Sequence, residues 1–260
     1  MTKAAVFDIA SLRKSVSIWS CLALLTIFIV PAALRADTGR SNGEITAGVQ
    51  SRLYKAGLFK HGQVNVQVND GVATLTGNVE SYAEKMRAER AAKHQDGVQQ
   101  VVNNIEVNTQ DIGTQQILAQ ARHQVVTYPN YTIFDHITLS ATGNQLTIGG
   151  EVTQPYKKST LGNILGGIKG VADLQNNIKV LPTSGMDDQI RLATANRIYR
   201  DPMFTNYANQ ANPPIHIVVE NGKVSLYGVV NSKAERQKAD MDARFASINF
   251  GVKNNLRVSS

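Results

Sequence analysis

Hydrophobic and polar positions along this chain repeat a pattern of roughly 65 residues three times. In the first copy, Ile45, Val49 and Leu53 are spaced as one face of a helix. Valines at positions 64, 66 and 68 then alternate with Asn and Gln, as in a half-buried strand. The turn signal Asp70-Gly71 separates this segment from a second alternating one. The pattern predicts a helix over about 44–56, followed by a β-hairpin that ends near residue 79.

A second helix and a third strand complete the first copy. Ser81 and Glu84 have the spacing of a capping box, so a helix is expected from there to about Gln95. Apolar alternation over 101–107 predicts a strand parallel to the second strand, reached by a right-handed crossover. The predicted fold class is α+β, with three tandem small αββαβ modules, each a three-stranded sheet packed against two helices. The modules are expected at residues 43–110, 113–183 (a divergent copy) and 186–260.

Two sequence markers recur with the same step of 26 residues in every copy. The first is a glycine in the second strand and the second is an asparagine in the third strand: Gly77, Gly150 and Gly228, then Asn103, Asn176 and Asn254. The glycines share parity with inward-facing residues, so we expect a helix directly over each of them, with a ligand touching the backbone as the alternative. The asparagines should face the interior and bind backbone groups at the end of the first helix or in a loop. A bulge that turns them outward is the alternative.

Residues 1–36 have the layout of a secretory signal peptide. Three basic residues precede an apolar run of about 15 residues, and small residues lead to Ala36 as the last position before cleavage. The run is short for a spanning helix, which needs about 20 apolar residues, so an uncleaved anchor is the alternative. Cys21 is the only cysteine and lies in this leader. The exported part is therefore expected to lack disulfides, thiolate metal sites and a cysteine nucleophile.

Charge and chemistry favour a binding protein over an enzyme. The whole chain has a net charge of +7, and removal of the leader lowers it to +4. That mild excess suits an anionic lipid surface or ordinary surface charge, and nucleic acid is not an expected partner. The five histidines show no metal-ligand spacing, and no nucleophile or phosphate-loop motif occurs. No catalytic residue, metal or cofactor is expected.

The second helix of the middle copy is the candidate lipid-contacting element. Lysines flank an apolar, glycine-rich strip that has no acidic residue. Cations beside an apolar strip can lie at a lipid interface. The predicted contact residues are Lys157, Lys158, Lys169, Leu161, Ile164 and Leu165. The alternative is that this strip is the core face of its own module.

The three copies resemble the BON domain family of bacterial envelope proteins. The resemblance depends on residues 71–79, on Ser81 and Glu84, on Gly97-Val98 and on 101–107, together with their counterparts. The second copy departs from the pattern at Asn144 and Lys157, and the third has Ile248-Asn249 where Gly-Val is usual.

This resemblance implies a helix–strand–strand–helix–strand fold in each copy and a location in the periplasm, with association with the membrane as a further expectation. It also implies a non-enzymatic role in envelope integrity or osmotic stress, through contact with phospholipid. The alternative function is a scaffold that docks an envelope protein, or another copy, through open sheet faces.

Overall fold

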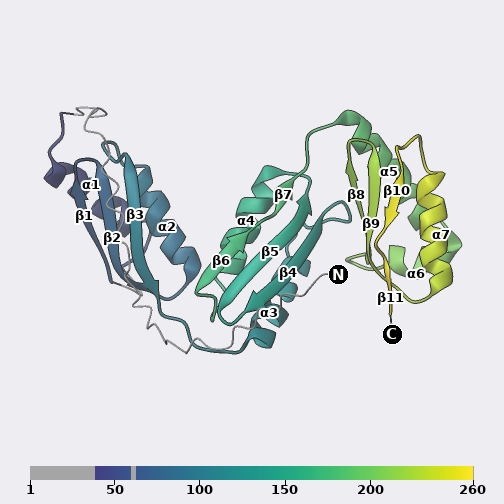
Figure 1. The fold of residues 1–260 in the computed structure, drawn as a ribbon, viewed down its shortest axis with the longest axis horizontal. Helices are drawn as coiled ribbons and strands as arrows, with labels where there is room; N and C mark the ends of the chain where they lie inside the picture. Colours follow the sequence, from purple (N-terminus) through teal and green to yellow (C-terminus); the bar gives the residue numbers. More distant parts are fainter. Residues whose placement is uncertain (1–38, 60–62, 260) are drawn as a thin grey trace, which may run out of the picture. The chain divides into compact units, whose positions relative to one another are not determined.

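The computed structural model describes residues 39–59 and 63–259 of the chain. The predicted signal peptide lies outside these residues. Within them the chain forms seven α-helices and three small sheets, and each sheet has its own hydrophobic core (Figure 1). The prediction of three αββαβ modules of the α+β class is confirmed. No helix in the described part of the chain combines the length and apolar character needed to cross a membrane.

The first module has the predicted order of elements. They are α1 (Asn42–Lys55), β1 (Gln63–Asn69), β2 (Val72–Val79), α2 (Tyr82–Lys93) and β3 (Gln100–Val107). Strand β2 is central, antiparallel to β1 and parallel to β3. Leu53 of α1, Leu75 of β2 and Ala88 of α2 meet in the core and are fully buried. Both helices therefore lie on one face of the sheet, which leaves the other face polar.

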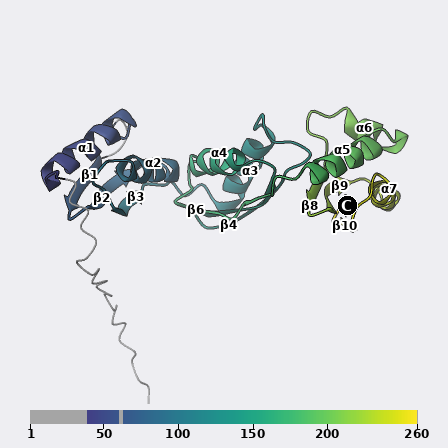
Figure 2. The same ribbon diagram turned by 90° about the horizontal axis from the view of Figure 1, so that it is seen from above.

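The second module repeats this plan with an interrupted third strand. Its elements are α3 (Thr114–Val126), β4 (His136–Thr142), β5 (Gln145–Val152), α4 (Pro155–Gly166), β6 (Asp173–Asn176) and β7 (Lys179–Val180). Pro155 occupies the first turn of α4, as expected from its fixed φ. Figure 2 shows α3 and α4 on one side of the sheet. Because β6 and β7 both pair with β5, they are two halves of the predicted third strand.

The third module contains an additional helical turn. Its elements are α5 (Gly185–Tyr199), the 3₁₀ helix η1 (Pro202–Phe204), α6 (Thr205–Ala208), β8 (Ile215–Glu220), β9 (Lys223–Val230), α7 (Lys233–Arg244), β10 (Val252–Asn254) and β11 (Arg257–Val258). Phe204 and Tyr207 of the inserted turn are buried in the module core. The longer connection before β8 is therefore packed structure rather than an open loop.

The recurring glycines are explained by backbone geometry. Gly77, Gly150 and Gly228 have φ of +112°, +98° and +122°, values that side chains with a Cβ rarely adopt. A Cβ at each position would overlap a main-chain carbonyl oxygen of the neighbouring first strand of the hairpin, that of Gln63 in the first module. The expectation of a helix directly over these glycines is wrong. The close neighbour is the adjacent strand.

The recurring asparagines tie the third strand to the second helix. The Nδ2 atoms of Asn103, Asn176 and Asn254 donate to main-chain carbonyls of Lys85, Lys158 and Arg236, at 3.1, 3.0 and 2.8 Å. Their Oδ1 atoms accept from the backbone N–H two residues later. The expected backbone partner is present, but the expectation that it lies at the end of the first helix is wrong. The first module has the same second bond in the continuous strand β3, so this bond alone does not split the third strand of the other modules.

Candidate functional surfaces

Lys157 is an interior residue and has no access to a lipid surface. It is 4% exposed, and its Nζ lies 2.7 Å from Asp135 Oδ2 and 2.9 Å from Thr153 Oγ1. Asp135, in the loop before β4, is 0% exposed. A buried lysine with a carboxylate partner stabilises the module it lies in, because both charges would be costly without each other. The structure therefore contradicts the predicted lipid contact of Lys157.

The apolar strip of α4 is likewise part of the core. Leu161 and Leu165 are buried against α3 and β5, and Ile164 packs partly buried against the same cluster. Gly166 lies where α2 approaches, since a Cβ there would come within 3.1 Å of the Tyr82 ring. Leu161 and Leu165 of α4 thus pack in the core of the second module, and Gly166 lets α2 of the first module approach. The alternative interpretation, a core face, is the one that the structure supports.

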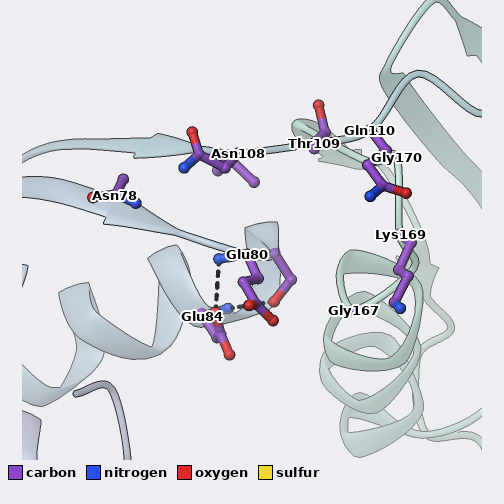
Figure 3. A pocket seen from close by; sticks show the side chains of 11 residues that line it. Asn78, Glu80, Glu84, Asn108, Thr109, Gln110, Gly167, Lys169 and Gly170 are labelled. Atoms are coloured by element: carbon purple, nitrogen blue, oxygen red, sulfur yellow. Dashed lines mark hydrogen bonds between the residues drawn. The ribbon is translucent and has the colours of Figure 1, made fainter. Parts of the chain in front are cut away.

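The two remaining lysines of the predicted lipid site differ from each other. Lys158 is half-buried, and its main-chain carbonyl accepts from Asn176. Lys169 is exposed and lines a pocket of about 800 Å³. Figure 3 shows Glu80 and Glu84 on the opposite wall of this pocket. Two carboxylates facing one ammonium group do not make a surface that selects anions.

Three large apolar side chains are exposed close together in sequence on a different surface, in the third module. The loop between α7 and β10, residues 245–251, is here called the apolar loop. Within it Phe245 is 68% exposed, Ile248 89% and Phe250 66%. Large apolar side chains gathered on a surface typically mark a protein or membrane contact. The candidate surface of this chain is therefore in the third module.

The backbone holds the apolar loop in place from the inside. Phe250 N–H donates to the Gly222 carbonyl at 2.9 Å, and Val224 N–H donates to the Gly251 carbonyl at 2.9 Å. Asn249 turns inward, and its Nδ2 donates to the Ala243 carbonyl. With the backbone and Asn249 satisfied internally, Ile248 and Phe250 are left to solvent.

The first module shows what this loop looks like without its apolar residues. Equal spacing from the recurring glycine places His94 opposite Phe245, Gly97 opposite Ile248 and Gln99 opposite Phe250. Gln99 lies beside Gly71 of the hairpin turn, just as Phe250 lies beside Gly222. The two loops share the hydrogen bond to the hairpin turn, but their backbones differ, because Gly97 has a φ of +92° and Gly251 a φ of +129° while the equivalent Ile248 and Gln100 do not have positive φ. Since the first module makes the shared contact with Gln99, that contact does not require the apolar side chains. They are the residues that sequence analysis missed, although it noted that Ile248-Asn249 replaces the usual Gly-Val.

Two cations accompany the apolar loop. Lys223 directly follows Gly222, and Lys253 lies two residues after Gly251 on the parallel strand. Both are exposed, and neither forms an ion pair with a residue that the structure describes. Arg244, at the end of α7, is paired with Asp240 at 2.6 Å. Free ammonium groups beside exposed rings are the combination expected of an interfacial surface.

The described residues hold no group of three or more His, Cys, Asp and Glu side chains that could bind a metal ion. Several titratable residues with altered pKa values lie where the second and third modules meet. Burial, with the nearby His216 and Arg257, lowers the pKa of His136 to about 4. The His136 ring stacks on Tyr227 with centroids 3.8 Å apart. This is a packed contact between two rings of neighbouring modules.

The chain is similar to several known proteins. Over 138 residues it is 26% identical to a protein of Anaplasma centrale described as an uncharacterized protein in the gshII 5′ region, covering 51% of this chain and 89% of that protein. The C-terminal domain of CdsD, a structural protein of the Type III secretion system of Chlamydia trachomatis, matches with a TM-score of 0.24 and 13% identity, covering 85% of this chain and 100% of the domain. The PrgH periplasmic domain matches with a TM-score of 0.21 and 13% identity, covering 80% and 100%.

The family comparison matches two of the three modules. Residues 41–109 and 203–259 match the family described as "BON domain". The first range contains the whole first module, and the second contains the third module from η1 onward. The apolar loop lies inside the second range.

Proposed function

Because this chain is a BON-domain protein, with BON regions at residues 41–109 and 203–259, we propose that it is a non-enzymatic protein of the cell envelope that docks on anionic phospholipid. The contact surface is the apolar loop of the third module. The predicted export signal and the family resemblance support a location in the periplasm. There it would bind the membrane surface and help to maintain the envelope under osmotic stress.

The single observation that carries this proposal is the exposure of Phe245, Ile248 and Phe250 in one short loop. Aromatic and aliphatic side chains at a loop tip can enter the region between lipid headgroups and acyl chains, where each buried CH₂ contributes about 0.8 kcal/mol. Lys223 and Lys253 add electrostatic attraction of about 1 kcal/mol each near an anionic surface. Salt should weaken the contribution of the lysines to membrane binding and leave the contribution of the apolar side chains unchanged.

Co-sedimentation with phosphatidylglycerol vesicles tests this proposal. The informative variant is Phe245→His, Ile248→Gly and Phe250→Gln together, because these are the residues at the equivalent positions of the first module. We expect binding to weaken by about tenfold or more, since three apolar side chains no longer enter the bilayer. High salt should weaken wild-type binding without abolishing it.

The matched control is Tyr156→Gln, which removes an exposed aromatic ring of α4, 50% exposed, from a surface outside the proposed contact. We expect this variant to bind as wild type does. Equal sedimentation of the wild type and the triple variant would refute the proposal. If neither binds vesicles and cross-linking in cells yields a defined partner, the apolar loop docks a protein.

A further inference from the structure

Strand β1 is an edge strand without the features that usually protect an edge. The sheet order is β1-β2-β3, so one side of β1 has no strand beside it. Its sequence, Gln-Val-Asn-Val-Gln-Val-Asn, has no charge and no proline over seven residues. Natural edge strands are normally interrupted by lysine, proline or a bulge, because a free edge can pair with another chain. The absence of protection makes β1 a candidate pairing surface.

The second and third modules contact each other near the first strands of their hairpins. In β8 the N–H of Ile217 donates to the Ile133 carbonyl of the second module at 2.7 Å. Strands β4 and β8 also contact each other, and Lys179 pairs with Glu220 at 2.6 Å. The backbone of β1, by contrast, makes no hydrogen bond to a described residue outside its own hairpin. The outer edge of β1 is therefore free among the residues described.

The side chains of β1 match those of the same strand running in the opposite direction. With Val66 opposite Val66, an antiparallel pair brings Val64 opposite Val68, Asn65 opposite Gln67 and Gln63 opposite Asn69. Valine meets valine on the helix-covered face, where Val64 and Val68 are buried. Amide meets amide on the open face. All seven residues are paired without one face mismatch, and the arrangement closes as a twofold dimer.

We propose that β1 is the interface of a twofold dimer, in which the β1 strands of two copies pair antiparallel into one continuous six-stranded sheet. A second copy fits better than a charged peptide, because β1 has no charge that would select one. The main-chain hydrogen bonds supply affinity and the alternating valines fix the register. The inference does not depend on lipid binding, since the apolar loop lies in a different module.

A pair of charge variants tests both the dimer and its register, with the mass measured by light scattering across a concentration series. Asn65→Lys with Gln67→Lys places lysine opposite lysine twice across the twofold axis, which is destabilising. Asn65→Lys with Gln67→Glu places opposite charges there. We expect the first variant to be monomeric, with dimerisation weakened about tenfold or more, and the second to remain a dimer. The same change of mass in both, or a wild-type monomer throughout, would overturn the proposal.

A disulfide supplies an independent measurement. In a Cys21→Ser background, Val66→Cys brings two cysteines opposite each other at the twofold axis, with Cα atoms about 4.5–5.5 Å apart, within disulfide range. We expect an oxidised, covalent dimer. Thr76→Cys, at an exposed position of the central strand β2, is the control and should stay monomeric on oxidation. Cross-linking at position 76 instead of 66 would indicate stacking of sheet faces and exclude the edge pairing.

Discussion

The ammonium group of Lys157 lies 2.7 Å from a carboxylate oxygen of Asp135, and both side chains are inside the second module. Asp135 also accepts hydrogen bonds from the backbone N–H and hydroxyl groups of Thr132 and Thr153. The carboxylate therefore gathers the loop before β4, the end of β5 and the start of α4 at one point. The charge of Lys157, which suggested a lipid surface, is instead paired with a buried carboxylate inside the module.

Replacing Lys157 by methionine should destabilise the second module by about 3–5 kcal/mol, because the buried Asp135 carboxylate loses its counter-ion. Hydrogen exchange of the β5 amides measures the free energy of opening that module. Lys158→Met is the control, because the side chain of Lys158 is half-buried and forms no ion pair with the residues described. We expect it to change stability by less than about 0.5 kcal/mol. Equal effects would show that the pair is not a stabilising contact.

Gly150→Ala should destabilise the same module by about 2–4 kcal/mol. The φ of +98° disfavours alanine, and its Cβ would overlap the His136 carbonyl, so the hairpin must shift. The neighbouring Gly149→Ala would meet only the Thr138 hydroxyl, which can rotate away. A change within about 1 kcal/mol of zero is expected there. Thermal unfolding of the two variants compares them directly, and similar losses would argue against the backbone explanation.

Asn176→Asp should cost about 1–3 kcal/mol, because the Nδ2 donor to the Lys158 carbonyl is replaced by a carboxylate oxygen facing that carbonyl. Asn177→Asp introduces the same charge one residue later. The Asn177 side chain is exposed, so little effect is expected. Urea unfolding followed by circular dichroism gives both values. If the two substitutions proved equally harmful, added charge rather than the lost hydrogen bond would be the cause.

Mild acid should weaken the packing between the second and third modules. Burial lowers the pKa of His136 to about 4 and also lowers that of His216. Both rings are therefore neutral in the folded chain at pH values where an unfolded histidine, with pKa near 6.5, takes up a proton. Their contribution is present above about pH 6.5, declines as the pH falls, and for His136 is lost below about pH 4.

The measurement is the pH dependence of thermal stability for His136→Phe, which keeps an aromatic ring against Tyr227 and removes the titration. We expect a flatter profile between about pH 6.5 and 4 than in the wild type. Glu151 contributes the opposite slope, because burial raises its pKa above the ordinary value. Replacing the exposed His123 by Gln is the control. An unchanged slope in the His136 variant would remove this histidine as the cause.

The threefold repeat made the fold predictable. Apolar periodicity, turn signals and capping boxes then identified its helices and strands. The hairpin predicted to end near residue 79 does end at Val79, because the Asp70-Gly71 turn and the apolar alternation fixed its position. The recurring glycines and asparagines were recognised as structural, but their partners were not. Spacing along the chain does not say whether a helix or the adjacent strand approaches a glycine.

The candidate site was much harder to predict. Lys157 and Lys158 are adjacent in sequence, yet only the first has a buried partner, and that partner lies 22 residues upstream in a loop. No local pattern indicates such a pair. The departure at Ile248-Asn249 was visible, but its consequence depends on where the loop faces. A sequence shows that Phe250 is apolar, and only the structure shows that its ring lies beside Gly222 and stays 66% exposed.

Each module closes its own core, and among the residues described only Tyr82 and Phe134 pack from one module against the core cluster of the next. The modules of such a chain can unfold one at a time under a pulling force. If its two ends were drawn apart, one module could extend by roughly 200 Å, at about 3.5 Å per residue, while the others stayed folded. Such a chain would lengthen by unfolding a module before either of its ends detached.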